Sequence, residues 1–440
     1  MPKKNHRQKK RQFSAFDHLQ QVVSWSTATL LALSVLLLPR AAAMPTLFTR
    51  TNDNNAAVVL RRSAPACTNY TTVVHPGFSY VDKSPNNQGQ PNLASGHNNT
   101  YITYTSSVTT TPTVKVNAIL DNDLLLLPNG SNDVSTNIAN KNGPKIIVTK
   151  GGLVIPFYVS GSLSYFSKID PNTLNRANNV NGFPLEQPLS TYDSGSGQNR
   201  YSNGVGLDGG GHIEAFTSQE VSLNYQVFVR AYQTDDVTPL FDNLQLSTNT
   251  SYITANPIVS KSKTTSGNFT GIWQRQISVT KPNELVSRRF NCNGTNINFI
   301  DAKEKLYNSQ VPALVGKNCF NALQLDRADG STVISFQNQN ISTGTAQACF
   351  IIVDNTGVVT KFQTIPLTIT ADTTQFIPLT ETPDGFAVTL TGTGTGKQKL
   401  YIQRFYDDGN AKDTTPIQLD AATQLYGQRS PSSISHGNGL

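Results

Sequence analysis

The residues with the clearest capacity for chemistry lie in one glycine-rich stretch between Asn203 and Glu214. Asp208, His212 and Glu214 stand close together there, and the last two point to one face if the segment is a β-strand. Paired carboxylates are what a glycosidase requires, but no second acid can be placed opposite these from the sequence. We therefore interpret the cluster as a polar turn, without catalytic residues, and expect Asp208 and His212 to contribute to binding.

Other motifs of enzymes and cofactors are weak or missing in this sequence. Gly204 to Gly209 has the glycine spacing of a dinucleotide-binding loop, but that motif needs a strand before it and a helix after it, and a β-rich repeat follows instead. The sequence contains no G-x-S-x-G, no H-E-x-x-H and no P-loop. The histidines of residues 63–427 are well separated: His75, His97 and His212. We expect no cofactor and no histidine metal site.

Two further features bear on ligands. Asp407, Asp408, Asn410 and Asp413 could surround a calcium ion, but Asp-Asp-Gly also favours a hairpin turn and the EF-hand spacing is missing, so no metal is predicted and calcium stays an alternative. Trp273 is the only tryptophan after the leader, and we expect it to be exposed on a binding loop.

The first 62 residues have the pattern of a leader. A basic flank precedes an uncharged, largely apolar run from Val22 to Leu38, and Ala41 to Ala43 provides small residues for cleavage. Residues 1–43 are therefore predicted to be a signal peptide of a secreted protein, with a single-pass signal anchor as the alternative. Residues 44–62, ending in Arg61-Arg62, have the pattern of a propeptide or linker with a dibasic processing site.

Charge and modification motifs are consistent with an extracellular protein. Although the chain has a formal charge of +7, residues 63–440 carry 25 basic and 26 acidic residues, so nucleic-acid binding is not expected. Asn-x-Ser/Thr sequons predict N-glycosylation at Asn69, Asn98, Asn129, Asn249, Asn268, Asn293 and Asn340. Four cysteines suit an oxidising compartment. We predict a Cys292–Cys319 disulfide, with Cys319–Cys349 as its competitor.

The elements that must position these residues are β-strands. Short alternating runs rich in Thr, Val, Ile, Tyr and Phe are separated by Gly, Asn, Asp and Pro. A repeat is clearest between Leu285–Gly294 and Leu400–Gly409, and repeat units end near residues 121, 170, 235, 293, 354 and 408, at a mean spacing of about 57 residues. Units of this length are typical of four-stranded propeller blades.

Residues 383–409 resemble the repeat of secreted fungal-type β-propeller glycoproteins, Asp-Gly-Gly-Phe-x-Val followed by aromatic-x-Gln-Arg-Phe-Asp-x-x-Gly. The resemblance implies a fold only. We predict an all-β propeller of about six blades within residues 63–427, followed by a flexible tail at 428–440; two β-sandwich domains are the alternative. Thr68 to Val74 is a candidate strand for closing the ring.

A ring of loops on a rigid scaffold suits presentation of a binding surface. We expect a secreted or cell-surface glycoprotein that binds a protein or glycan without catalysis. The alternative is an extracellular carbohydrate-active enzyme on the same scaffold, which would require acids that converge on the central funnel.

Overall fold

The computed structural model describes residues 36–37, 47–48, 59–60, 87–107, 113–120, 132–134, 141–142, 144–159, 164–176, 187–188, 200–218, 224–278, 281–294, 296–369, 376–393, 398–419 and 435–436. The predicted cleavage site at Ala43, the dibasic site at Arg61-Arg62, the strand candidate Thr68 to Val74, and Cys67, Asn69 and Asn129 lie outside these residues. Among the described residues, no helix has the length and apolar character needed to cross a membrane.

Six antiparallel sheets follow one another along the chain, and we number them as blades 1 to 6. Blade 1 contains β4 (Asn87–Gly96), β5 (Asn99–Ser107), β6 (Thr113–Leu120) and β7 (Asn132–Asp133). Blade 2 contains β8 (Lys141–Asn142), β9 (Ile147–Thr149), β10 (Gly152–Val159), β11 (Ser164–Ile169) and β12 (Gln187–Pro188). Blade 3 contains β13 (Arg200–Gly206), β14 (His212–Ser218), β15 (Gln226–Ala231) and β16 (Leu244–Gln245).

The C-terminal blades have the same order. Blade 4 contains β17 (Ile253–Lys261), β18 (Asn268–Gln276), β19 (Asn283–Cys292), β20 (Ile297–Phe299) and β21 (Lys305–Leu306), and the 3₁₀-helix η1 (Pro312–Leu314) follows it. Blade 5 contains β22 (Asn318–Asp326), β23 (Thr332–Gln339), β24 (Ala346–Val353) and β25 (Val359–Ile369). Blade 6 contains β26 (Leu379–Thr382), β27 (Gly385–Thr393), β28 (Gln398–Tyr406) and β29 (Ile417–Gln418). Outside the blades, β1 (Leu36–Leu37) pairs with β30 (Ser435–His436), and β2 (Leu47–Phe48) pairs with β3 (Val59–Leu60).

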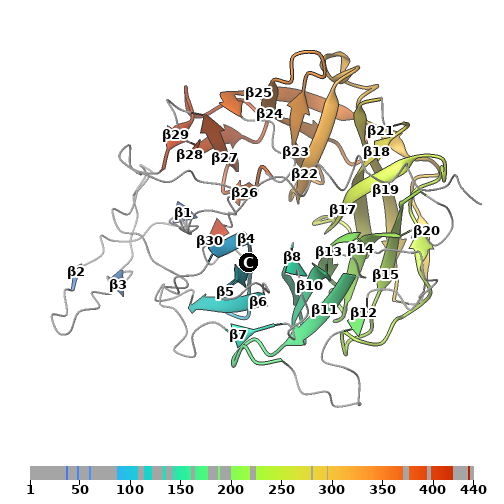
Figure 1. Cartoon of the computed structure of the whole chain (residues 1–440), viewed down its shortest axis with the longest axis vertical. Coiled ribbons are helices and arrows are strands. Elements are labelled where there is room, and N and C mark those ends of the chain that lie inside the picture. Colours follow the sequence, from blue (N-terminus) through green and yellow to red (C-terminus); the bar gives the residue numbers. More distant parts are fainter. Residues whose placement is uncertain are drawn as a thin grey trace, which may run out of the picture.

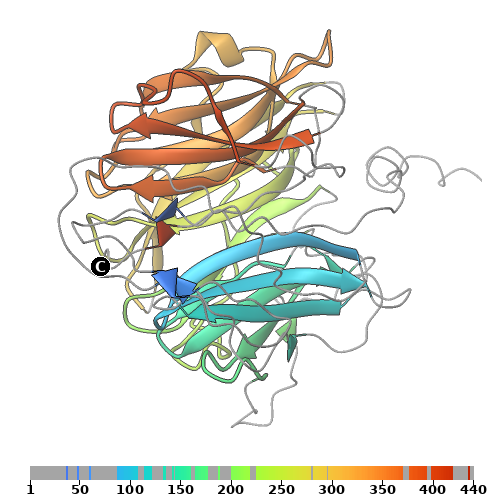
Figure 2. The ribbon, with the colours of Figure 1, turned by 90° about the vertical axis from the view of Figure 1, so that its left-hand side faces the viewer.

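The six sheets surround a common axis (Figure 1), and a view at right angles shows their strands in stacked, twisted layers (Figure 2). From blade 1 to blade 6, the first strands of blades that follow one another in the chain contact each other. Several first strands contain a β-bulge, and Asn256 of β17 and Asn321 of β22 have positive φ angles at their bulges. The chain is therefore a six-bladed β-propeller, as the sequence predicted, and the alternative of two sandwiches is wrong.

The repeat spacing corresponds to one blade, and each predicted unit end lies within a few residues of the end of a blade's third strand. The repeated aromatic residues pack in the cores. Phe386 of β27 stacks on Phe405 of β28 with 5.3 Å between ring centroids, and Phe269 stacks on Phe290 in blade 4 at 5.6 Å. These four rings are buried, so aromatic pairs fill the cores of these blades.

A glycine stands at the start of the second strand in several repeats for a steric reason. In blade 6, Gly385 has a φ of 154°, and a Cβ built there would lie 2.0 Å from the carbonyl oxygen of Phe405. Gly211 is placed in the same way in blade 3, 2.2 Å from the carbonyl oxygen of Tyr232. The second strand can therefore approach the third only through a residue without a side chain.

We predict that Gly385→Ala lowers the free energy of unfolding by more than about 1 kcal/mol, because the added methyl group collides with backbone. Gly209→Ala is the matched control, since a Cβ at Gly209 meets no atom within 4 Å. Denaturant titration of both variants checks the prediction, which is wrong if the two midpoints shift equally.

Candidate functional site

The structure separates the three predicted binding residues. Asp208 is exposed in the turn between β13 and β14, where its carboxylate pairs with Lys261 at 2.6 Å and accepts a hydrogen bond from Ser266 at 2.9 Å. The hydrogen bond from Lys261 is the main cause of a lowered pKa for Asp208. Both partners belong to blade 4, so Asp208 joins two blades at the surface.

The expected exposure of Trp273 is wrong. Trp273 lies on β18 opposite Val286 of β19 and is completely buried in the core between blades 3 and 4. The indole packs there because β18 is a central strand, covered on both faces. An aromatic platform for sugars at this position is therefore excluded.

The predicted Cys292–Cys319 disulfide is not formed. Cys292, Cys319 and Cys349 are free and buried. Cys292 belongs to the core between blades 3 and 4, whereas Cys319 and Cys349 belong to the core between blades 4 and 5. Although Cys292 and Cys319 are near each other in sequence, the sheet of blade 4 lies between them. Burial raises the pKa of Cys319 to about 12 and that of Cys349 to about 11, so neither is a reactive thiolate at neutral pH.

Five of the predicted glycosylation sites are among the described residues. Asn98 and Asn293 are exposed, and Asn249, Asn268 and Asn340 are half-buried. Their glycosylation stays a prediction.

His212 is the centre of a buried polar cluster between blades 2 and 3. Its Nδ1 lies 3.0 Å from Oδ1 of Asp236, and its Nε2 lies 3.4 Å from Oε1 of Glu214. Thr149 of blade 2 donates a hydrogen bond to Asp236 at 2.7 Å, and Lys168 of the same blade lies 3.8 Å from that carboxylate. His212, Glu214 and Asp236 have no exposed surface, which contradicts the expectation that His212 is an exposed loop residue.

This cluster replaces an aromatic pair of the repeat. Gly211 corresponds to Gly385, so His212 occupies the position of Phe386 and Glu214 that of Val388. The imidazole stacks on Tyr232 with 4.4 Å between ring centroids, as Phe386 stacks on Phe405. Blade 3 thus keeps the stacked rings of the repeat, although titratable residues occupy the positions of Phe386 and Val388.

Burial controls the chemistry of the cluster. Desolvation raises the pKa of Glu214, whose carboxyl group is completely buried and has His212 as its neighbour at 3.4 Å. Burial alone would lower the pKa of His212, but the hydrogen bonds and charges of Asp236 and Glu214 outweigh it and raise the pKa. Because no substrate reaches these atoms, the cluster is a polar part of the interface between blades rather than an active site.

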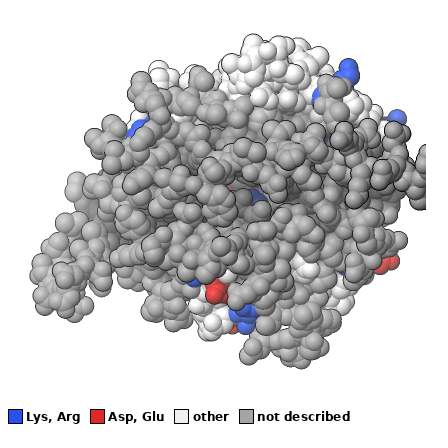
Figure 3. Space-filling view, viewed as in Figure 1, with Lys and Arg blue, Asp and Glu red and all other residues white. Residues whose placement is uncertain are grey.

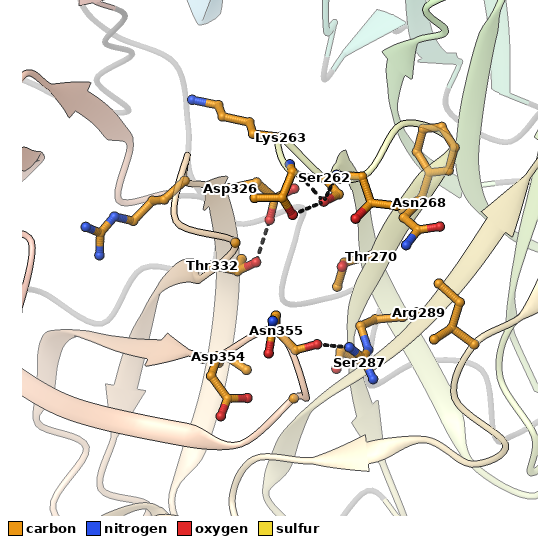
Figure 4. A pocket seen from close by; sticks show the side chains of 18 of the residues that line it. Ser262, Lys263, Asn268, Thr270, Ser287, Arg289, Asp326, Thr332, Asp354 and Asn355 are labelled. Atoms are coloured by element: carbon orange, nitrogen blue, oxygen red, sulfur yellow. Dashed lines mark hydrogen bonds between the residues drawn. The ribbon is translucent and has the colours of Figure 1, made fainter.

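A surface cavity lies between blades 4 and 5 (Figure 4). Its volume is about 180 Å³, smaller than that of most ligand pockets. The turns β17–β18, β22–β23 and β24–β25 surround it, so it opens on the face that carries these turns. Nine of its 19 lining residues carry a hydroxyl or amide group: Ser262, Thr264, Thr265, Asn268, Thr270, Ser287, Tyr307, Thr332 and Asn355. Tyr307 and Ser287 share a hydrogen bond of 2.6 Å.

Asp326 is the buried carboxyl group of this cavity. It ends β22 and is 8% exposed; Oδ1 accepts a hydrogen bond from Thr332 at 2.5 Å, while Oδ2 has no partner with hydrogen-bond geometry. Burial raises the pKa of Asp326, against the opposing effects of the Ser260 and Thr332 hydroxyls and of Lys263. Asp326 lines the cavity although Oδ2 itself has almost no accessible surface, so a ligand hydroxyl can bond to this incompletely bonded oxygen only when neighbouring side chains move aside.

The cations around the cavity are all engaged by partners from the protein. Arg289 binds Asp301 through both its guanidinium and its backbone N–H and also reaches the carbonyl oxygen of Asn355. The other two pairs are Lys263 with Glu381 and Arg327 with Asp407. On the face seen in Figure 3, the charged side chains of described residues are scattered. The cavity therefore offers polar but largely charge-compensated surroundings.

Sequence reasoning missed this cavity. Nothing in the local sequence distinguishes Asp326 from a turn aspartate such as Asp329, which is exposed, because the neighbouring blade buries only the former. The candidate calcium ligands also have other partners: Asp408 accepts hydrogen bonds from Asn410, and Asp413 binds Arg404. Within the described part of the chain, no group of three or more His, Cys, Asp and Glu residues is arranged to hold a metal.

The central channel lacks the acid pair of a glycosidase among the residues described. On the innermost strands of the six blades, the acidic residues are Asp326 of β22 and Glu381 of β26. Glu381 is paired with Lys263. The converging acids required by the enzymatic alternative are therefore not found on these strands.

Comparison with solved structures finds several carbohydrate-active proteins with a low similarity to this chain. A thermostable family-43 glycoside hydrolase has 12% sequence identity and a TM-score of 0.38, over 62% of this chain and 93% of that chain. The polysaccharide lyase Uly1 has 9% identity and a TM-score of 0.48, over 81% and 84%. Endo-arabinase from Bacteroides thetaiotaomicron has 11% identity and a TM-score of 0.34, over 77% and 95%. At these values the likeness assigns no activity and no site residue.

No family model and no curated protein matches the sequence. The resemblance to secreted fungal-type repeat glycoproteins stays a prediction.

The polar interface between blades 2 and 3 predicts a pH dependence of stability. His212 and Glu214 both have raised pKa values in the folded state, so each stabilises the fold most when protonated. The contribution of His212 is complete below its unfolded pKa of about 6.5 and is lost as the pH rises through the higher folded value. We expect the free energy of unfolding to fall as the pH rises above about 6.5.

The double variant His212→Phe/Glu214→Val, which introduces the residues of blade 6, should flatten this dependence. Denaturant titrations at several pH values measure the slope, and Ile213→Val, between the two positions, is the control for altered packing. An unchanged slope in the double variant would exclude the cluster as the cause.

Proposed function

We propose that this protein binds an uncharged glycan in the cavity between blades 4 and 5. The observation that carries the proposal is the buried Asp326 carboxyl, which has an oxygen without a hydrogen-bond partner on the wall of a hydroxyl- and amide-lined cavity. Asp326 and Thr332 lie on one wall, and Asn268, Thr270 and Ser287 lie on the other (Figure 4). Sugar hydroxyl groups both donate and accept hydrogen bonds, as such a lining requires.

The charge pattern favours a neutral ligand over an acidic one. Arg289, Lys263 and Arg327 already bind carboxylates or carbonyl oxygens of the protein. A carboxylated or sulfated sugar would have to break these pairs, which leaves a charge without its partner. An uncharged polysaccharide does not incur that cost.

A carbohydrate-active enzyme is the second candidate, and the raised pKa of Asp326 is what favours it. A carboxyl group that stays protonated can act as a general acid. Hydrolysis of a glycosidic bond also needs a second carboxylate, and Asp354, the other acid of the lining, accepts hydrogen bonds from Thr356 and Val358 in its own turn. Binding is therefore the better supported function.

Substitutions of Asp326 separate the two candidates. Against a panel of uncharged cell-wall polysaccharides and their hexasaccharides, we expect Asp326→Leu to weaken binding at least tenfold, because the apolar side chain cannot bind a hydroxyl. Asp326→Asn should retain most of the affinity, since an amide also donates and accepts. Asp329→Leu, in the exposed adjacent turn, is the control. Calorimetry measures the affinity, and thermal unfolding verifies that each variant is folded.

Released sugar is measured in the same samples. Turnover by the wild type that disappears in both Asp326→Leu and Asp326→Asn would establish the enzyme instead. Equal affinity of Asp326→Leu and the wild type would exclude the cavity as the binding site.

Secretion is part of the proposed function, supported by the apolar run from Val22 to Leu38 and the sequons. We predict that protein recovered from the culture medium begins at Met44 or, after dibasic processing, at Ser63. N-terminal sequencing checks this. Recovery only in membranes with Lys3 retained would favour the signal anchor.

A further inference from the structure

One predicted modification site coincides with the proposed binding cavity. Asn268, Phe269 and Thr270 form a sequon at the start of β18, and all three residues line the cavity between blades 4 and 5. The other sequon asparagines that the structure describes are not part of this lining. Asn268 therefore differs from Asn98, Asn249, Asn293 and Asn340 in its surroundings.

The amide group of Asn268 is held in one orientation. Its Oδ1 accepts a hydrogen bond of 2.9 Å from Nδ2 of Asn291 on β19. Its backbone N–H donates to the carbonyl oxygen of Thr265, and its own carbonyl accepts from Ser262, which fixes the residue at the end of the β17–β18 turn. Nδ2, the atom that carries an N-linked glycan, makes no hydrogen bond to any described residue. Figure 4 places the Asn268 side chain on the wall formed by blade 4.

We propose that Asn268 carries an N-glycan whose first sugar occupies the mouth of this cavity, so that the protein's own glycan covers the binding site. The modification joins Nδ2 to the anomeric carbon of an oligosaccharide donated by a lipid pyrophosphate. The bond from that carbon to the pyrophosphate oxygen breaks, the lipid pyrophosphate leaves, and the amide nitrogen loses a proton. The half-buried position does not oppose transfer, because N-glycans are added before the chain has folded.

The chemistry of the cavity suits this occupant. The first sugar of an N-glycan is an uncharged N-acetylhexosamine, and Thr265, Thr270 and Thr332 line the cavity together with Asn268. A sugar seated there would lie against the β22–β23 turn of blade 5, across from its own attachment point. The expected competition between the attached glycan and a free glycan rests on the proposed function. The position of the attached glycan in the cavity does not depend on that function.

The first test measures whether Asn268 is glycosylated and whether its glycan contacts the β22–β23 turn. The full chain is secreted from a eukaryotic host, and glycopeptide mass mapping measures modification of Asn268 and of the exposed Asn293. Hydrogen exchange of residues 326–331 is then compared between the wild type, Asn268→Gln and Thr270→Val. The last two variants remove the sequon in different ways, so one misfolded variant leaves the other informative. Thr270→Ser retains the sequon and the hydroxyl, and Asn293→Gln removes a distant glycan.

We expect an occupied Asn268, and faster exchange in 326–331 for Asn268→Gln and Thr270→Val than for the wild type, Thr270→Ser and Asn293→Gln. An unmodified Asn268, or identical exchange in all five proteins, would overturn the proposal. Binding of chitin and cellulose hexasaccharides is measured on the folded wild type before and after enzymatic removal of its N-glycans, because Asn268 and Thr270 themselves line the cavity, and at least tenfold tighter binding is expected after removal. If the glycan protects residues 326–331 from exchange but the protein binds no hexasaccharide before or after glycan removal, the position of the attached glycan is supported and the proposed function is contradicted.

Discussion

The structure depends on one constraint: a four-stranded sheet has two faces, and each face must be buried against a neighbouring sheet. A single blade cannot satisfy this requirement, but a closed ring of blades does. The repeat supplies the means, a glycine that lets the second strand approach the third and an aromatic pair that fills the space between blades. Gly385, Phe386 and Phe405 show this arrangement in its simplest form.

The same constraint explains why the interfaces between blades differ in character. Blades 5 and 6 meet through an apolar core that includes Phe386 and Val388. Between blades 2 and 3, the equivalent positions hold His212 and Glu214, so that titratable groups are buried within the framework of the repeat. Between blades 4 and 5, the apolar core is closed on one side by a polar cavity with Asp326 in its wall. Because several similar interfaces hold the blades together, the fold tolerates a polar interface between blades 2 and 3 and a cavity between blades 4 and 5. The cavity provides the space for a ligand.

The candidate site illustrates the limits of local sequence patterns. Asp208, His212 and Glu214 lie within seven residues and suggest a polar turn, yet Asp208 is exposed while the other two are inaccessible. Trp273 suggests an exposed platform but lies on a strand covered on both faces. Cys292 and Cys319 are near in sequence, yet they face different cores. In each case a neighbouring blade, contributed by residues far away in the chain, decides the surroundings.

The sequence by itself determined the all-β class, the repeat of about 57 residues and the six blades, because strand alternation, turn residues and repeat spacing are local properties. It also determined that the buried aromatics belong to the repeat. Only the tertiary structure decided which polar residues are reachable. The turns of blades 4 and 5 form a cavity because two sheets separated by some 60 residues are placed side by side. Asp326 is buried where blade 4 packs against blade 5, and Glu214 is buried where blade 2 packs against blade 3. This burial raises the pKa values of both carboxyl groups, and the neighbouring residues in sequence do not predict it.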